Sequence, residues 1–331
     1  MPPLLFFLQQ EGYKASQTAG KMKLRENIKD FLFEKTTAFF ALCVLALTLL
    51  LFALLVRESL PAIRKIGASF VTNTTWDPVL EEFGALPFLY GTVVSSFLAI
   101  LIALPLGVGA AIYINEFAPE WLKTPVSFLA ELLAAIPSVI YGLWGIFVLL
   151  PILRDYFMKP VSRVLGWIPL FQGPVYGPSM LAAGVLLSIM IVPFILSVSR
   201  EVLATVPKAQ KEAVLSLGGT RWEMIRIVVG QHCIPGIFGA TILGLGRALG
   251  ETMAVTMVIG NRPDIVLSLF QPGYSMAAVI ANEFTEATGD LYLSALVEIG
   301  LVLFLLTIVV HLVAKSILRS MVPGARKGAA R

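Results

Sequence analysis

The sequence is poor in charge and in the side chains that build metal sites or disulfide frameworks. Of its 331 residues, only 14% are Asp, Glu, Lys or Arg, whereas 57% are hydrophobic. It holds two cysteines and two histidines, and the histidines, His232 and His311, are far apart along the chain. This content excludes a disulfide-stabilised small domain and argues against a zinc cluster. We therefore expect no metal site.

Three further absences narrow the class of protein. No Gly-x-x-x-x-Gly-Lys-Ser/Thr phosphate loop is present, so the chain is not itself an ATPase, and we expect neither catalytic residues nor a bound cofactor. The formal charge of +4 does not indicate a nucleic-acid partner, because the basic residues lie in short segments between apolar blocks. A secretory signal is not predicted either, since residues 1–20 offer only residues 4–8 as an apolar core.

Long apolar runs are what the sequence has in abundance. A helix of about 20 apolar residues spans a bilayer, and six segments reach that length. These segments cover residues 37–56, 92–115, 126–152, 179–198, 234–258 and 295–314. The pattern predicts an all-α polytopic membrane protein with six transmembrane helices. Prolines at Pro105, Pro137 and Pro193 are expected to interrupt three of the spans.

The distribution of Lys and Arg predicts which side of the membrane each segment faces. With an even number of spans, both termini lie on the same side. Seventeen basic residues fall on the side of the termini and seven on the other, and positive charge collects in cytoplasmic segments. We therefore expect a cytoplasmic N-terminal segment over 1–36 and a six-span region over 37–319. Within that region 199–233 is a cytoplasmic loop, and 320–331 form a cytoplasmic tail.

The cytoplasmic loop between the fourth and fifth spans predicts a helical hairpin. Pro207 suits the first position of a helix, and Gly218-Gly219 suits its end. Thr220 and Glu223 have the spacing of a capping box, so a second helix should begin at once. A short hairpin at the membrane face is suited to the groove of a partner protein. A solvated amphipathic loop without a partner is the alternative.

The fifth span carries two opposite charges. Arg247 and Glu251 are four residues apart, which on a continuous helix brings the two side chains together. An ionised group deep in a membrane is costly and belongs in the interior of a bundle with a partner. We interpret Arg247 as a contact for a translocated anion and Glu251 as the group that orients the guanidinium and limits its charge. An ion pair that only holds the helices together is the alternative.

The hairpin resembles the EAA loop of ABC importer permeases. The motif consists of Glu212-Ala213-Val214 followed, after three residues, by Gly218. That family usually has Ala where Val214 stands, and often a Leu-Pro pair near the start of span five that this chain lacks. The resemblance implies that the loop couples the membrane subunit to an ATPase through Glu212, Ala213 and Gly218.

The fifth span narrows this resemblance to the PstC-type phosphate permeases. Residues 244–255 are similar to that family almost letter for letter, and residues 75–92 and 282–284 agree with it as well. The similarity runs from about residue 23 to about residue 319. It implies the fold of a type I ABC importer permease and a multi-pass location in the bacterial cytoplasmic (inner) membrane. The implied function is translocation of inorganic phosphate across the lipid bilayer, and Arg247 and Glu251, interpreted above from their charges, are the residues we expect on its path.

The same resemblance implies a set of partners. They are a PstA-type permease in a heterodimer, two copies of a PstB-type ATPase that uses ATP and Mg²⁺, and a PstS-type phosphate-binding protein. Other readings remain open at this point. The residues alone do not separate phosphate from sulfate or molybdate, and a secondary anion transporter, a passive anion channel and a membrane scaffold or sensor are the other classes. A secondary transporter would often show inverted repeats, and none is evident.

Overall fold

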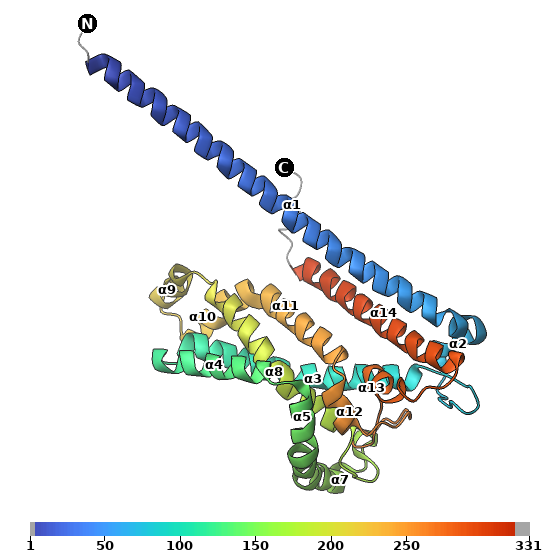
Figure 1. Ribbon diagram of the computed structural model, residues 1–331. Helices are drawn as coiled ribbons and strands as arrows, with labels where there is room; N and C mark the ends of the chain where they lie inside the picture. The colour runs from blue at the N-terminus through green and yellow to red at the C-terminus, as the bar shows by residue number, and fades with distance from the viewer. Residues whose placement is uncertain (1–3, 322–331) are drawn as a thin grey trace. The chain divides into compact units, whose positions relative to one another are not determined.

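The computed structural model describes residues 4–321, so most of the predicted tail at 320–331 lies outside the described residues. The chain divides into two compact units, one ending at Arg57 and the other beginning at Glu58. Every regular element in the described residues is helical, and the β-pairing there consists of two isolated bridges (Figure 1). The predicted all-α class is confirmed.

Six helices in the described part of the chain are long and apolar enough to cross a membrane. This number confirms the prediction, although the limits differ from the expected ones. The six segments are Lys29–Ile66, Leu86–Phe117, Ser138–Leu165, Met180–Ala204, His232–Leu249 and Asp290–Ser320.

The first unit consists of the larger part of one long helix, α1 (Leu4–Ile66). Over residues 29–57 almost every side chain is exposed, and the exposed set includes the large apolar residues Phe39, Phe40 and Leu42. A helix that is hydrophobic on all sides is stable in the interior of a protein or in lipid. The composition of this segment is therefore that of a span that faces lipid.

The core of the second unit is built on two spans, α3 (Leu86–Ile112) and α8 (Met180–Ala204). Small residues let the two helices approach closely. A Cβ on Gly184 would lie 2.7 Å from the Leu98 Cβ, and one on Gly107 would lie 2.9 Å from the Ile195 side chain. Pro105 and Pro193 do not break these helices, contrary to expectation, because both lie inside continuous helix.

The predicted third span, 126–152, is divided in the structure. Its first part belongs to α4 (Glu120–Ala135), whose C-cap is Ile136, and a new helix begins after Pro137. Pro137 has an extended ψ of 139°, so the α-helical hydrogen bonds stop there. The span that follows combines three α-helices with two π-helical segments. They are α5 (Ser138–Trp144), η2 (Gly145–Leu149), α6 (Leu150–Ile152), η3 (Leu153–Met158) and α7 (Lys159–Leu165).

The predicted fifth span, 234–258, is divided as well. A π-helical segment, η5 (Ile225–Val229), leads into α11 (Gly230–Leu249). The chain then leaves the helix over three residues before α12 (Met253–Ile259) begins. The single span predicted over 234–258 therefore corresponds to two shorter helices in the structure.

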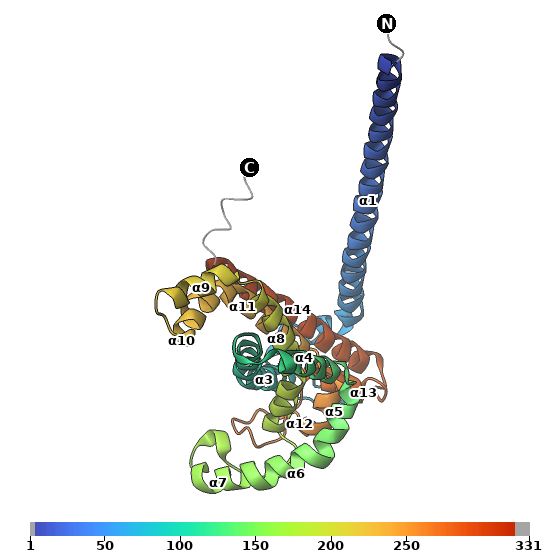
Figure 2. The ribbon, with the colours of Figure 1, turned by 90° about the vertical axis from the view of Figure 1, so that its left-hand side faces the viewer.

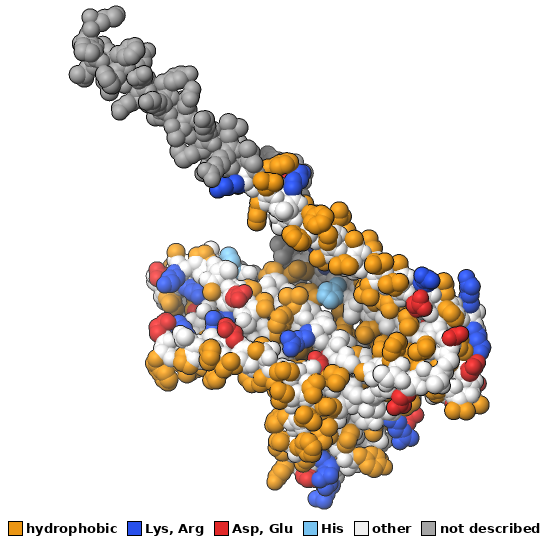
Figure 3. All heavy atoms as spheres, viewed as in Figure 1, with side chains coloured by type: hydrophobic (Ala, Val, Ile, Leu, Met, Phe, Trp, Pro, Cys, Tyr) orange, Lys and Arg blue, Asp and Glu red, His pale blue; other side chains and the backbone are white. Residues whose placement is uncertain are grey.

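The remaining helices connect or complete the spans. The sixth span belongs to α14 (Asp290–Met321), and π-helical η1 (Tyr113–Phe117) continues α3. The short elements are α2 (Ser69–Thr72), η4 (Pro169–Phe171), α9 (Lys208–Ser216), α10 (Arg221–Met224) and α13 (Met276–Glu283). Figures 1 and 2 show α9 and α10 together at one end of the second unit, away from α7. On the face in Figure 3, charged side chains gather mainly at the ends of the unit, with one basic patch between them, and hydrophobic side chains cover much of the remaining surface.

Candidate functional site

The hairpin predicted after the fourth span is present. Its first helix, α9, begins at Lys208, one residue later than predicted. Pro207 is therefore its N-cap and not its first helical residue. The helix ends in a Schellman motif. The Gly219 N–H donates to the Val214 carbonyl at 3.1 Å, and the Gly218 N–H donates to the Leu215 carbonyl at 3.0 Å. Gly218 has a φ of 85°, in the left-handed region that favours glycine.

The second helix of the hairpin begins with the predicted capping box. The Thr220 hydroxyl accepts from the Glu223 N–H at 3.2 Å, and the Glu223 carboxylate accepts from the Thr220 N–H at 2.7 Å. The Thr220 N–H and the Thr220 hydroxyl both donate to the Glu223 carboxylate and favour its ionised form, so the pKa of Glu223 is lowered from its ordinary value. The two caps fix the turn between α9 and α10.

The outer face of the hairpin carries the residues that the sequence singled out. Glu212, Ala213 and Gly218 are all exposed. Two large apolar side chains lie beside them, Leu217 with 89% and Trp222 with 68% of their surface exposed. Exposed apolar groups on a projecting element, set among polar residues, are typical of a surface that binds another protein.

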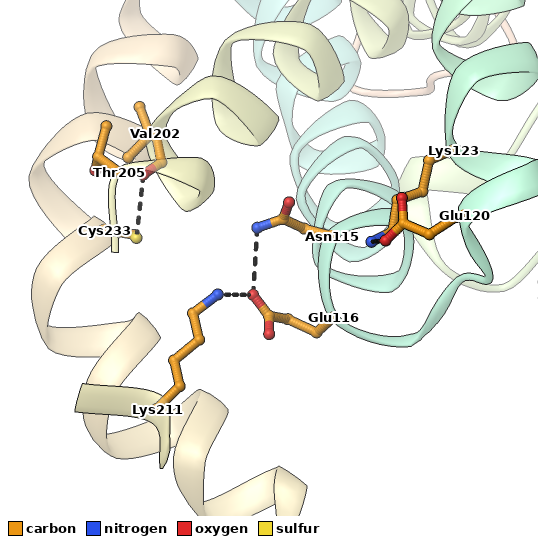
Figure 4. Close-up of polar contacts among 8 residues, drawn as sticks. All are labelled: Asn115, Glu116, Glu120, Lys123, Val202, Thr205, Lys211 and Cys233. Carbon is orange, nitrogen blue, oxygen red and sulfur yellow. Dashed lines mark hydrogen bonds and ion pairs between the residues drawn. The ribbon is translucent and has the colours of Figure 1, made fainter. Parts of the chain in front are cut away.

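The inner face of the hairpin is joined to the ends of the membrane helices. An apolar cluster contains Met224 and Ile225 together with Ala111 and Leu203, and Val214 of α9 packs against it. Beside this cluster, the Lys211 ammonium group contacts the Glu116 carboxylate at 2.5 Å. Figure 4 shows Lys211 reaching across to Glu116, which also accepts from the Asn115 amide at 3.2 Å. The sequence did not indicate this ion pair, because its residues are 95 positions apart.

Arg247 and Glu251 do not form the predicted pair. Arg247 lies in the last turn of α11, whereas Glu251 lies beyond the end of that helix. No ion pair joins the two within the described residues. The Glu251 carboxylate instead accepts from the Ala254 N–H at 3.3 Å, at the start of α12. The one-turn geometry expected for a continuous helix is therefore wrong, because the helix ends between the two residues.

The breaks in the third and fifth spans lie next to each other. Helices α5 and α12, which each begin just after a break, pack closely at Gly142. A Cβ on that glycine would lie 2.3 Å from the Met257 sulfur and 3.3 Å from the Ala254 Cα. The Tyr141 hydroxyl donates to the Leu133 carbonyl at 2.8 Å and lies within electrostatic range of Arg247. The exposed guanidinium of Arg247 is thus near both breaks.

A third group of polar residues joins two stretches that the sequence had singled out separately. Glu283 accepts from Trp76 Nε1 at 2.8 Å, from the Tyr292 hydroxyl at 2.7 Å and from the Tyr274 hydroxyl at 3.3 Å. Burial is the main cause that raises the pKa of Tyr274, so this hydroxyl stays a donor. Trp76 also packs edge-on against Phe88. Trp76 and Glu283 are 207 positions apart in the sequence. The sequence therefore singled out both stretches but gave no sign that they are in contact.

The described residues offer little for metal or thiol chemistry. They hold no group of three or more His, Cys, Asp or Glu side chains placed to bind a metal ion. Cys43 and Cys233 are both free thiols, and the buried Cys233 donates to the Val202 carbonyl at 3.7 Å. The distinctive groups are therefore the hairpin, the two breaks with Arg247, and the Glu283 cluster.

Comparison with known proteins agrees with these features. The family model described as "Binding-protein-dependent transport system inner membrane component" matches residues 103–326. The chain is 46% identical over 325 residues to the phosphate transport system permease protein PstC of Mesorhizobium japonicum, covering 97% of this chain and 99% of that protein. It is 45% identical to the PstC of Haemophilus influenzae over 88% of this chain and 93% of that protein.

A solved structure supports the fold independently. The methionine ABC transporter MetNI, in an inward-facing conformation, matches with a TM-score of 0.50 and 19% identity, over 75% of this chain and all of the matched chain. This likeness is one of fold, and it agrees with the expected type I importer architecture. Together with the matches above, it shows that the chain is a multi-pass, non-catalytic permease component that belongs to the family of inner membrane components of binding-protein-dependent transport systems.

Proposed function

We propose that this chain is the permease subunit of an ATP-driven ABC importer that moves inorganic phosphate across the cytoplasmic membrane. The observation that carries the proposal is the similarity to proteins named phosphate transport system permease protein PstC, which extends over 97% of this chain. The projecting hairpin supports the ABC class, because a passive channel would have no use for such a surface. The chain conducts the anion, and a partner hydrolyses the ATP.

The partners follow from this assignment. A PstA-type permease completes the membrane dimer, two copies of a PstB-type ATPase bind ATP and Mg²⁺, and a PstS-type binding protein delivers phosphate. Glu212, Ala213 and Gly218 belong to the surface that docks on the ATPase. The exposed Leu217 and Trp222 side chains support this docking, since they offer apolar area that a groove can cover.

Arg247 is the residue we assign to the translocation path. Desolvating an ion such as phosphate costs many kcal/mol unless a group of opposite charge compensates it. The Arg247 guanidinium is exposed on the chain and has no carboxylate partner among the described residues. It lies beside two broken helices, and half-helices of this kind form substrate sites in transporters. Glu251 lies at the second break and accepts from the Ala254 N–H in the first turn of α12.

Uptake by the reconstituted complex tests the proposed function. The complex that contains this chain is placed in proteoliposomes, and the entry of labelled phosphate is measured with and without ATP, Mg²⁺ and the binding protein. We expect uptake only when all are present, with sulfate and molybdate failing to compete. Uptake without ATP would contradict the ABC assignment. Preferential uptake of sulfate or molybdate would contradict phosphate as the substrate.

A further inference from the structure

The ion pair between Lys211 and Glu116 connects the hairpin to a membrane span. Lys211 belongs to α9, and Glu116 belongs to η1, the π-helical continuation of α3. We propose that this pair carries the movement of the hairpin into the second span, so that both residues are positioning residues for coupling. The proposal rests on the assigned docking of the hairpin on an ATPase. It concerns neither phosphate nor ATP contacts.

The pair is well placed because α9 has few other attachments. In the described residues, the only helix whose backbone approaches α9 extensively is α10. Its inner face presents Lys211 and, three residues on, Val214, which contacts the apolar cluster. An apolar contact of this kind is non-directional. The ion pair, by contrast, fixes both the distance and the direction between α9 and η1.

Burial makes the pair strong enough for this role. The side chains of Lys211 and Glu116 are only 18% and 8% exposed. Charges that are largely removed from water interact more strongly than surface pairs, and the loss of one partner leaves the other uncompensated. The Asn115 amide donates to the same carboxylate oxygen that Lys211 contacts. The Glu116 carboxylate is therefore held from both sides.

Helix η1 passes any displacement directly to the core. The backbone runs from α3 into η1 without leaving helical conformation, and α3 packs tightly along α8 at Gly107 and Gly184. A π-helical segment is a wider turn that is often found at functional sites. Movement of Glu116 with the hairpin would thus shift the end of α3 relative to α8.

A second ion pair nearby supplies a matched control. Glu120 and Lys123 contact each other at 2.7 Å, but both belong to α4, and the Glu120 side chain is 89% exposed. Figure 4 shows this pair beside the Glu116 pair. Its hydrogen bond joins no two elements, and the influence of Lys208 of α9 on the exposed Glu120 carboxylate is the smallest of those that act on its pKa, so loss of the pair should leave coupling unchanged.

The test uses the intact complex in proteoliposomes. Single variants Glu116→Gln and Lys211→Met are compared with the reversed double variant Glu116→Lys with Lys211→Glu, and with the control Glu120→Gln with Lys123→Met. Complex assembly, ATP hydrolysis and phosphate uptake are measured separately. We expect each single variant to assemble and hydrolyse ATP while phosphate moved per ATP falls about tenfold or more, because one buried charge loses its partner. The reversed pair should recover most of the coupling, and the control should match the unmodified complex.

The outcomes separate this inference from the proposed function. A photo-crosslinker at Leu217 reports whether the hairpin docks on the ATPase. Absence of that crosslink in the unmodified complex would overturn the docking itself. Normal docking together with normal coupling in both single variants would overturn only the role of the pair. Loss of assembly in the singles and in the reversed double would also overturn it, because the pair would then be structural.

Discussion

Substitution of Gly218, in the turn of the hairpin, tests whether the hairpin docks on the ATPase. The φ of 85° at Gly218 is strained for any residue with a Cβ, whereas no heavy atom lies within 4 Å of the place where that Cβ would be. Replacement by valine therefore introduces backbone strain without a steric clash. Asparagine tolerates the left-handed region better than other residues with a side chain, so Gly218→Asn is the conservative counterpart.

The size of the effect follows from the backbone alone. A left-handed conformation costs a residue with a Cβ about 1–2 kcal/mol, which corresponds to a factor of about 5–30 in an equilibrium. The strain favours a different turn and moves α9 relative to α10. We expect Gly218→Val to weaken the binding of the ATPase by about that factor and to lower phosphate uptake, whereas Gly218→Asn should have a smaller effect.

Gly67 provides the matched control for this experiment. It has a φ of 70°, and no heavy atom lies within 4 Å of the position that its Cβ would take, but it lies between α1 and α2, outside the hairpin. Gly67→Val should therefore cost similar stability and leave ATPase binding intact. The assay measures ATPase affinity, ATP hydrolysis and phosphate uptake at matched complex abundance. Equal effects of Gly67→Val and Gly218→Val on ATPase affinity, or none from Gly218→Val, would refute the reasoning.

Three further predictions concern the other groups. Because the pKa of Glu223 is lowered in the fold, the carboxylate stabilises the hairpin fully above its ordinary pKa of 4.5, and this stabilisation is lost as the pH falls through the lowered pKa. Trp222 fluorescence should report this transition. The same transition in Glu223→Gln would contradict its assignment to Glu223. Glu283→Ala leaves three donors without their acceptor and should lower the free energy of unfolding by roughly 2–4 kcal/mol, whereas Glu283→Gln should lower it less. Equal melting temperatures for the unmodified protein and both variants would contradict this structural role of Glu283. Arg247→Gln, Glu251→Gln and the double variant should assemble, and the two that lack the arginine should fail in phosphate uptake; full uptake by the double variant would sink the translocation role.

Local patterns in the sequence predicted the hairpin well. The glycine stop and the Thr220–Glu223 capping box depend on residues within a few positions of each other, and both appear as expected. Contacts across long stretches of sequence were not predictable in this way. The Lys211–Glu116 pair and the hydrogen bonds of Glu283 depend on which helices pack together, and a single sequence does not specify that packing.

Hydropathy predicted the number of membrane spans but not the breaks within them. Apolar length gave the right number of spans, because length and composition are what a bilayer requires. It could not locate the breaks at Pro137 and after Leu249, since apolar residues resume directly after each break and the average hydropathy stays high. Proline was an incomplete signal as well: of three prolines expected to interrupt spans, only Pro137 separates two helices, while Pro105 and Pro193 lie inside intact ones. The error in the fifth span also produced the wrong geometry for Arg247 and Glu251.

The break after Leu249 has a consequence for how the subunit is oriented among the lipids. Lipid tails offer no hydrogen bonds, so irregular backbone at membrane depth has to be covered by protein or reached by water. The same holds for an exposed arginine at that depth. We therefore expect residues 250–252 and Arg247 to mark a side of the chain from which acyl chains are excluded. In the permease dimer proposed above, we expect the second subunit to close that side.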